Sequence, residues 1–313
     1  MITPSLTKMI VQEHLYNPIK GKVLTLGKQL VAMTHEQAIH LLEECGVSLS
    51  KEAIDKTKDM VENKVRYSCE KDFITDKAFF LLLGVEQLYS MDVSDYENCD
   101  IIHDLNKPVE EKFHNSYDFI FDGGTFDHLI DVKVSFSNVI RMLKNGGRVF
   151  QWNAASNFTG AAYISFGPDL FFDYYMINEF RDCKTYIAEG DSIGQLENWD
   201  LFLLSDVANY ENFKSDSTQM VIVIAEKGSD TKTDGIPIQS QYRCTELKKV
   251  YRELLQRAKS STRPILKGEK KSNEIINIKV DILIDKKHAM SCQNSYNEII
   301  TRAPVGFEYV GKF

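Results

Sequence analysis

The segment Tyr117-Asp-Phe-Ile-Phe-Asp-Gly-Gly-Thr-Phe-Asp-His-Leu129 decides the fold. Its first five residues are a short β-rich run that stops at Asp122 and two glycines, which predicts a strand followed by a sharp turn. Apolar residues then recur at helical spacing over 127–144, and the sequence Asn-Gly-Gly at 145–147 ends that helix. Residues 148–152 form a strand again. This order predicts a parallel α/β sheet, in which ligands bind at the carboxyl ends of the strands.

Upstream, residues 22–27 predict a first strand that closes on Gly27. A helix follows from Thr34, where Gln37 completes a capping box, and it ends at Gly46. Strand, loop and helix are how a nucleotide-binding unit begins. Gly27 nevertheless stands alone where a dinucleotide site shows three glycines, and a buried β-α turn without a ligand explains one glycine equally well.

Two further predicted strands end in acids. The run 85–91 leads to Asp92, and the run 99–103 leads to Asp104. In a parallel sheet these acids and Asp122 would gather along one edge. A carboxylate at the second strand can accept two hydrogen bonds from a ribose diol, although Asp also commonly begins a turn. The long separation between Gly27 and Asp92 requires an inserted helical segment, for which residues 49–66 and 75–83 are the predicted helices.

The second half of the chain continues the sheet and then changes composition at Lys227. We expect two units, a ligand-binding domain over residues 1–227 and a C-terminal α+β extension over 228–313 that serves as a lid, substrate or oligomerisation element. The predicted elements are a helix from Pro168 to about Phe180, strands at 183–189 and 219–226, a helix at 245–259 and a strand at 275–284.

Composition limits the function. The chain has 313 residues, 43% of them hydrophobic, a net charge of -8 and a pI near 5.5. The acidic balance argues against nucleic acid as the main partner. The absence of a long apolar run and of a leader-like start predicts a cytoplasmic protein without a membrane segment. Six scattered cysteines without a close pair predict free thiols, with neither a metal site nor a disulfide framework.

The motifs together resemble class I S-adenosylmethionine-dependent methyltransferases, and among these the bacterial enzymes associated with small molecules and surface polysaccharides. The resemblance covers about residues 20–227. It implies a Rossmann-like doubly wound sheet, mostly parallel with an antiparallel last strand, and S-adenosyl-L-methionine as cofactor with S-adenosyl-L-homocysteine as product. The residues that carry it are Gly27, Met91–Glu97, His103–Asn106, Asp122–His128, Leu143–Gly147 and the aromatic loop Tyr163–Phe172.

The resemblance implies a role for each matching position. The turn at Gly27 borders the methionine part of the cofactor, Asp92 binds the ribose hydroxyls, and Asp104 with Leu105 flanks the adenine. Asp122 and Gly123 line the pocket near the methionine moiety and the sulfonium. The full set of expected cofactor-binding residues is Gly27, Gln29, Asp92, Val93, Asp104, Leu105, Asp122, Gly123 and Gly124.

The expected catalytic residues are His128 and Asp127. An imidazole titrates near neutral pH, so His128 suits a base that accepts the proton of a hydroxyl, supported by Asp127 or Asp131. A histidine with a purely structural role at a helix start is the alternative. The residues expected to bind substrate, a small molecule or carbohydrate, are Asn153, Tyr163 and Phe166.

The sequence departs from the family in three places. Leu26-Gly-Lys-Gln29 has one glycine where two or three are usual, Phe126-Asp-His128 replaces Leu-Glu-His, and the aromatic loop lacks the expected histidine and glutamine. The first departure keeps open a second hypothesis, a binding or scaffold protein that has lost activity. A dinucleotide-dependent oxidoreductase, the third, would need the missing glycines. A homodimer is a further expectation.

Overall fold

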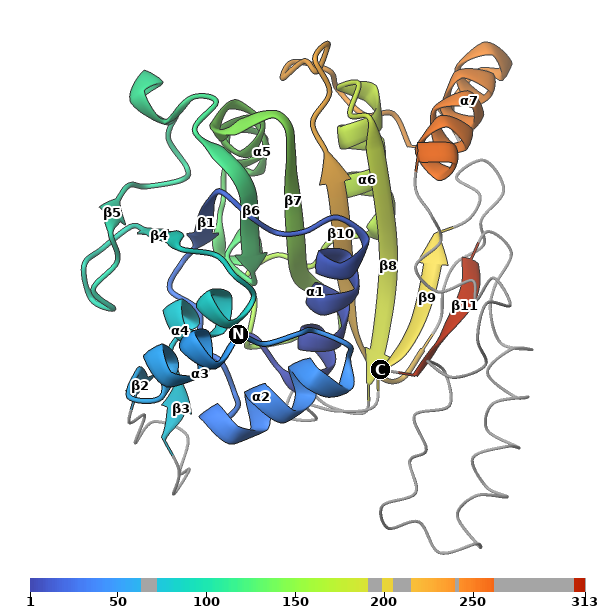
Figure 1. The fold of residues 1–313 in the computed structure, drawn as a ribbon. Coiled ribbons are helices and arrows are strands. Elements are labelled where there is room, and N and C mark those ends of the chain that lie inside the picture. Colours follow the sequence, from blue (N-terminus) through green and yellow to red (C-terminus); the bar gives the residue numbers. More distant parts are fainter. Residues whose placement is uncertain (63–71, 191–198, 205–214, 240–241, 262–306, 313) are drawn as a thin grey trace, which may run out of the picture.

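The computed structural model describes residues 1–62, 72–190, 199–204, 215–239, 242–261 and 307–312. A nine-stranded sheet forms its centre, in the order β11-β9-β8-β10-β7-β6-β1-β4-β5 (Figure 1). The strands are β1 (Lys22–Leu26), β4 (Gln87–Asp92), β5 (Ile101–Ile102), β6 (Tyr117–Gly123), β7 (Leu143–Ser156), β8 (Asp182–Gly190), β9 (Asp200–Leu204), β10 (Thr218–Glu226) and β11 (Phe307–Lys312).

The pairing confirms the predicted Rossmann-like sheet. Strands β5, β4, β1, β6 and β7 are mutually parallel, and β10 runs antiparallel between β7 and β8. The doubly wound order 3-2-1-4-5-6 is therefore formed by β5, β4, β1, β6, β7 and β8 in turn. The antiparallel strand β10 lies between the fifth and the sixth of these strands. Two more antiparallel strands, β9 and β11, extend the β8 edge, and the sequence reasoning predicted neither.

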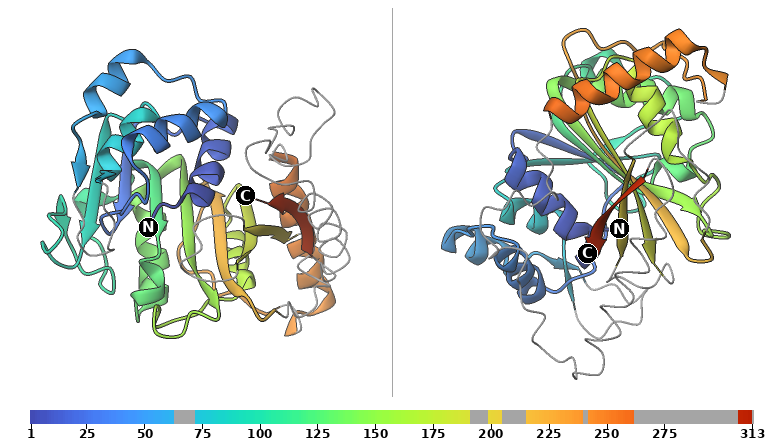
Figure 2. Two further views of the ribbon diagram at one scale, coloured as in Figure 1. Left: turned by 90° about the horizontal axis from the view of Figure 1, so that it is seen from below. Right: turned by 90° about the vertical axis from the view of Figure 1, so that its right-hand side faces the viewer.

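Helices cover both faces of the sheet, as the side view in Figure 2 shows. Helices α1, α2 and α4 pack on one face, where the core includes Ile10, Leu42 and Phe79. Helices α5 and α6 pack on the other, where the core includes Phe136 and Phe171. The bounds are α1 (Pro4–Tyr16), α2 (His35–Glu44), α3 (Lys51–Thr57), α4 (Asp76–Leu82), α5 (Val132–Met142), α6 (Pro168–Ile177) and α7 (Thr245–Ser261), with a small hairpin of β2 (Val61–Glu62) and β3 (Phe73–Ile74) and 3₁₀ turns at Glu111–Phe113 and Phe126–His128.

Local signals explain several helix starts. Thr34 and Gln37 form the predicted capping box of α2, with reciprocal bonds of 3.2 and 2.9 Å. Pro168 opens α6 at its first turn. Helix α1 was not predicted, although Thr3 caps it by accepting from the amide of Leu6 and Pro4 begins it. The sequence therefore contained a signal for this helix, because a Thr N-cap followed by Pro is a common pattern at helix starts.

The single helix predicted over 127–144 is wrong. The structure has a 3₁₀ turn at Phe126–His128, an extended Leu129, and then α5 capped by Asp131. The side-chain oxygen of Asn106 accepts from the amides of Ile130 and Asp131 at 2.8 and 2.9 Å. These hydrogen bonds hold the backbone in a non-helical conformation, so the helix begins only at Val132.

Other predicted bounds also shift. The helix predicted over 49–66 ends at Thr57, the third strand pairs only over Ile101–Ile102, and β7 begins at Leu143 and not at residue 148. The predicted strand 275–284 lies outside the described residues. The boundary at residue 227 remains a prediction; α7 contacts β8 and α6, and β11 pairs with β9.

Candidate functional site

The carboxyl ends of β4, β1 and β6 bring Asp92, Gly27 and Asp122 together. In the sheet register Leu26 pairs with Met91 on one side and with Asp122 on the other. Gly27 has φ +69°, a left-handed conformation that glycine adopts without strain. A Cβ built on Gly27 would lie 3.1 Å from Thr125 Oγ1 and 3.6 Å from Asp92 Oδ2. The turn, the acid of β4 and the loop after β6 therefore share one wall.

Asp122 is fully buried beneath this wall. Its Oδ1 accepts from the amide of Thr125 at 2.8 Å, and its Oδ2 accepts from Gln151 at 3.1 Å and Asn153 at 2.8 Å. Burial raises the pKa of this carboxyl to about 6. Thr125 in turn donates from Oγ1 to the carbonyl of Leu26 at 2.7 Å. Asp122 thus organises the end of β6 and faces the interior.

Sequence reasoning missed Gln151 and Thr125, and it assigned Asn153 to substrate. The sequence contained a signal for Gln151 and Asn153. Gln151 and Asn153 are polar residues two apart in the otherwise apolar stretch 149–155, so they share one face of β7. Both are buried and both bond Asp122. The alternation therefore indicated a buried polar partner on the neighbouring strand.

The crevice between β1 and β6 is occupied by Gln29. Its Nε2 donates to the carbonyls of Leu26 at 2.9 Å and Gly27 at 3.2 Å, and its Cδ would lie 2.9 Å from a Cβ on Gly123. The main-chain nitrogen of Met1 donates to Gln29 Oε1 at 3.1 Å and to the carbonyl of Gly123 at 2.8 Å. The carbonyls of Leu26, Gly27 and Gly123 are thus already hydrogen-bonded within the chain.

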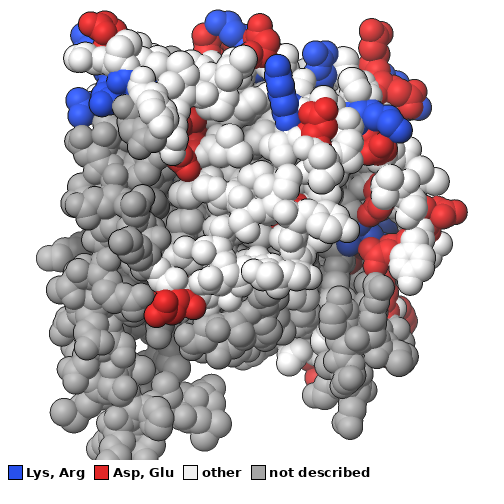
Figure 3. Space-filling view, turned by 180° about the vertical axis from the view of Figure 1, so that it is seen from behind, with Lys and Arg blue, Asp and Glu red and all other residues white. Residues whose placement is uncertain are grey.

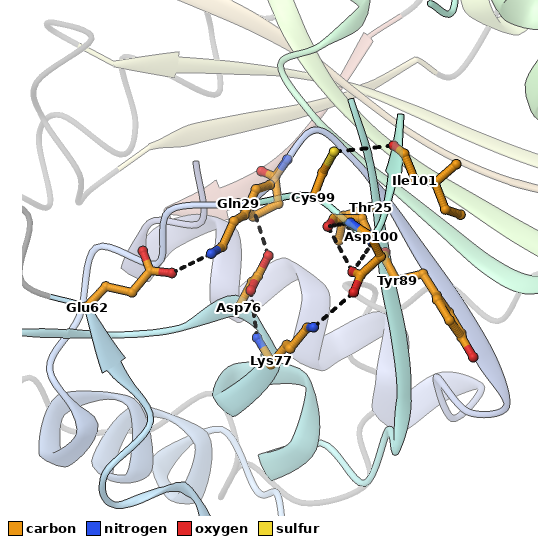
Figure 4. Close-up of polar contacts among 11 residues, drawn as sticks. Thr25, Gln29, Glu62, Asp76, Lys77, Tyr89, Cys99, Asp100 and Ile101 are labelled. Carbon is orange, nitrogen blue, oxygen red and sulfur yellow. Dashed lines mark hydrogen bonds and ion pairs between the residues drawn. The ribbon is translucent and has the colours of Figure 1, made fainter. Parts of the chain in front are cut away.

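The turn that carries Gln29 is fixed by the inserted segment (Figure 4). The amide of Gln29 donates to Asp76 Oδ2 at 3.1 Å, and Lys28 forms an ion pair with Glu62 at 2.9 Å. Burial raises the pKa of the Asp76 carboxyl. A cavity of about 210 Å³ lies beside these residues, with Ser90 and Asp100 in its wall.

The adenosine side of the wall is more open. Asp92 is half-buried and Val93 is exposed, and the amide of His103 donates to the carbonyl of Asp92 at 2.7 Å, which places the loop after β5 beside it. Hydrogen bonds from the side chain and main chain of Asn106 lower the pKa of Asp104. Leu105 is buried in the core. A carboxylate, an exposed apolar side chain and a second acid fit a nucleoside.

The fit to S-adenosylmethionine is therefore uneven. The chemistry of the donors around Asp92 suits the adenosine half. The methionine half fits only when the Gln29 side chain leaves the position it occupies, because Gly123 leaves space that Gln29 fills. Gly124, with φ +92°, lies against Trp152, where a Cβ would be 3.3 Å from the indole ring.

Asp127 and His128 lie at the mouth of the site, in the 3₁₀ turn after β6. Asp127 is buried, and its Oδ2 accepts from the amide of Ala154 at 3.2 Å. Among the residues that the structure describes, none forms a hydrogen bond with its Oδ1, which lies 3.5 Å from His128 Nε2 at an ion-pair distance. Burial raises the pKa of the Asp127 carboxyl.

The His128 side chain is half exposed and meets the ring of Tyr163 edge to face, with centroids 5.7 Å apart. Tyr163 is 80% exposed. The amides of Tyr163 and Ile164 both donate to the carbonyl of Asp127 at 3.0 Å, which ties the aromatic loop to the turn. Phe166, by contrast, is buried against Phe171. The structure brings His128 and Tyr163 together and places Phe166 in the core.

The known proteins that resemble this chain are solved structures. No family model and no curated protein matches the sequence. Among solved structures, a SAM dependent methyltransferase from Archaeoglobus fulgidus is 11% identical, with 72% of this chain and 95% of that chain covered and a TM-score of 0.37. TehB from Haemophilus influenzae is 15% identical, with 71% and 62% covered and a TM-score of 0.35.

A phosphoethanolamine N-methyltransferase 2 from Haemonchus contortus in complex with S-adenosyl-L-methionine is 12% identical, with 71% of this chain and 52% of that chain covered and a TM-score of 0.35. The fold assignment rests on the strand order itself. The chain has a Rossmann-like fold of the class I methyltransferase type, with its inserted antiparallel strand.

The described residues lack two other features. None of their helices has the length and apolar character needed to span a bilayer. Within the same residues, no group of three or more His, Cys, Asp or Glu side chains is arranged to hold a metal ion.

Proposed function

We propose that the protein is an S-adenosylmethionine-dependent methyltransferase that transfers a methyl group to a hydroxyl of a small molecule or sugar, with a surface-polysaccharide precursor as one such acceptor. The observation that supports this most is the convergence of Gly27 and Asp92 at adjacent strand ends. In open α/β sheets this edge is where nucleotide ligands bind.

The residues divide by the part of the cofactor they would hold. Asp92 accepts from the ribose hydroxyls, and Val93, Asp104 and the main chain of Leu105 border the adenine. The bound cofactor supplies a methyl group on a sulfonium, an electrophile that needs no covalent help from the protein. The residues proposed for the methionine side are Gly27, Gly123 and Gly124. Asp122 is proposed to fix their loop from beneath, and the side chain of Gln29 is proposed to move aside when the methionine moiety binds.

His128 is proposed as the base. Its Nε2 faces Asp127, so Nδ1 is the ring nitrogen proposed to take the proton of an acceptor hydroxyl. The Asp127 carboxylate then stabilises the charged imidazole and holds the ring in place, because its own position is fixed by Ala154 and Asn153. Tyr163 lies against the ring and is proposed to contact the acceptor.

Calorimetry with S-adenosylmethionine and S-adenosylhomocysteine tests the proposal. Wild type should bind both, and Asp92→Ala should weaken binding by about tenfold or more, because a charged hydrogen-bond acceptor to a diol is lost. Asp95→Ala is the matched control, an exposed acid of the same loop that should change nothing. Equal affinities of the two variants would remove Asp92 from the cofactor site.

A scaffold protein without activity is the second candidate. The filled crevice favours it, since Gln29 and Met1 take the hydrogen bonds that the methionine moiety needs. If wild type binds neither ligand at millimolar concentration, this candidate replaces the transferase.

A further inference from the structure

An apolar groove lies between α5 and α6, on the face of the sheet opposite α1. Its volume is about 460 Å³, within the range of roughly 300–1,000 Å³ of small-molecule sites. Phe136, Leu170 and Tyr174 line it, and the segment Gly235–Pro237 closes one side. Figure 3 shows this face, where charged side chains lie mainly along the margins and the centre is uncharged.

The walls of the groove are held in place. Phe136 stacks on Tyr174 with ring centroids 4.4 Å apart, and the Tyr174 hydroxyl donates to the carbonyl of Thr233 at 3.2 Å. The buried Asn178 clamps Gly235, accepting from its amide at 2.9 Å and donating to its carbonyl at 3.3 Å. Because side chains and segment are fixed by separate contacts, the groove is preformed and a ligand need not order it.

Among the described residues that line the groove, Lys133 alone carries a charge. It is exposed, whereas the chain as a whole carries a net charge of -8. A single cation beside an apolar, aromatic surface is complementary to a molecule with an apolar body and one negative group. A sugar would find few side-chain partners for its hydroxyls there, since the polar side chains among the described lining residues are those of Lys133, Ser165 and Tyr174, and Tyr174 already donates to Thr233.

One wall of the groove is hydrogen-bonded to the turn that carries Asp127 and His128. Ile164 lines it, and the amide of Ile164 donates to the carbonyl of Asp127. Val132, another lining residue, begins α5 directly after its cap Asp131. The groove is therefore walled by segments that adjoin the turn of His128 on both sides of the chain.

We propose that this groove binds a small amphipathic anion, with its hydrocarbon or aromatic body on Phe136 and Leu170 and its negative group at Lys133. Its assignment as the methyl acceptor rests on the proposed function and narrows the acceptor class, from small molecules and sugars to amphipathic acids that carry a hydroxyl.

Two fluorescent probes that share one aromatic body test the groove in the full chain. They are 1-anilinonaphthalene-8-sulfonate, which carries the negative group, and the neutral N-phenyl-1-naphthylamine. Both should bind wild type at one site without any cofactor. Lys133→Gln should weaken the sulfonate by roughly two- to fivefold, the range of an exposed ion pair, and leave the neutral probe unchanged. Lys112→Gln, at an exposed lysine outside the lining, is the control.

Ser165→Trp should weaken both probes by at least about tenfold, because the indole fills the groove from an exposed loop position and leaves the core intact. Val250→Gln, on the exposed side of α7, should have no effect. Probe binding that is absent, or equal in every variant, overturns the proposal. So does a concentration-dependent dimer that Ser165→Trp abolishes without any probe binding, because the groove would then bind a second copy.

The two proposals fail separately. If the probes behave as stated and calorimetry finds no S-adenosylmethionine binding, the anion groove stands and its role as acceptor site falls. If S-adenosylmethionine binds and the probes do not, the transferase stands and the groove proposal is wrong.

Discussion

Asp122 illustrates how burial changes the role of a residue at a strand end. The resemblance placed its carboxyl at the cofactor, whereas the structure surrounds it with donors from Thr125, Gln151 and Asn153. Burial raises its pKa in the folded protein from 3.8 to about 6. A carboxyl with a raised folded pKa adds stability that is present below its unfolded pKa and is lost as the pH rises through its folded pKa.

We therefore expect the free energy of unfolding of wild type, relative to Asp122→Asn, to fall by up to about 3 kcal/mol between pH 4 and pH 7. Both proteins share all other titratable groups, so the difference between their free energies of unfolding removes the contribution of those groups. Urea denaturation at a series of pH values measures it, with Asp95→Asn as the pH-independent control. A difference that grows as the pH rises would contradict the raised pKa.

Gln29 gives a second prediction at this scale. Its side chain fills the crevice at Gly123, so Gln29→Ala should open the methionine half and strengthen binding of S-adenosylhomocysteine several-fold, because no glutamine must be displaced. Calorimetry measures the dissociation constant, with the exposed Gln87→Ala as control. Weaker binding in Gln29→Ala would instead mean that this side chain contacts the cofactor.

His128→Ala should lower turnover by about a hundredfold or more while cofactor binding stays nearly intact, since a general base acts on the acceptor alone. The control is His40→Ala, on the exposed surface of α2. Initial rates and calorimetry on the same preparations separate the two effects. Unchanged turnover would assign the histidine a structural role.

Residue patterns predicted part of this site. The glycine turn after β1 and the acid after β4 follow from strand periodicity and Gly27's left-handed backbone. The orientation of Gln29 could not be predicted, because it depends on Asp76 and on Met1, which lie 47 and 28 residues away in the chain. The burial of Phe166 was equally hidden, since an aromatic residue in a loop suits either a site or a core.

Helix α1 shows how an element is held in place by charge. Glu13 is completely buried and pairs with Arg148 of β7 and with Lys184 of β8, the latter at 2.8 Å. Arg148 also donates to the carbonyl of Asn17 after the end of the helix. The single Glu13 carboxylate reaches both cations only when α1 lies across both strands.

We expect Glu13→Gln to destabilise the fold by about 3–5 kcal/mol, because two buried cations lose their counter-charge. Chemical denaturation followed by circular dichroism measures the loss, and the exposed Glu43→Gln on α2 is the control. A loss equal to that of the control would show that Arg148 and Lys184 find other partners.

The predicted start of an element was correct where a local sequence signal determined it. The prediction was wrong where a contact with a distant residue determined the start. The capping box of α2 and the proline of α6 were sufficient for those two helices. The 3₁₀ turn at Phe126–His128 and the late start of α5 depend on Asn106, more than 20 residues upstream. Strand β11 pairs with β9 across a long separation that no local pattern reports.

At the scale of the whole molecule, a ligand that binds only the folded state raises its stability. S-adenosylhomocysteine at a hundred times its dissociation constant should add about 2.7 kcal/mol, visible as a higher melting temperature. NAD and NADP should leave the melting temperature unchanged, because the turn at Gly27 lacks the glycines of a dinucleotide site. A shift with NAD alone would favour the oxidoreductase hypothesis.

The pairing of β9 with β11 affects how the molecule is made. Residues 200–204 leave the ribosome ~100 residues before residues 307–312, so during translation one edge of β9 lacks its partner strand until residues 307–312 have been made. We expect nascent chains on the same messenger RNA to associate through these unpaired strand edges. A chaperone that covers the edge should therefore raise the yield of correctly folded protein.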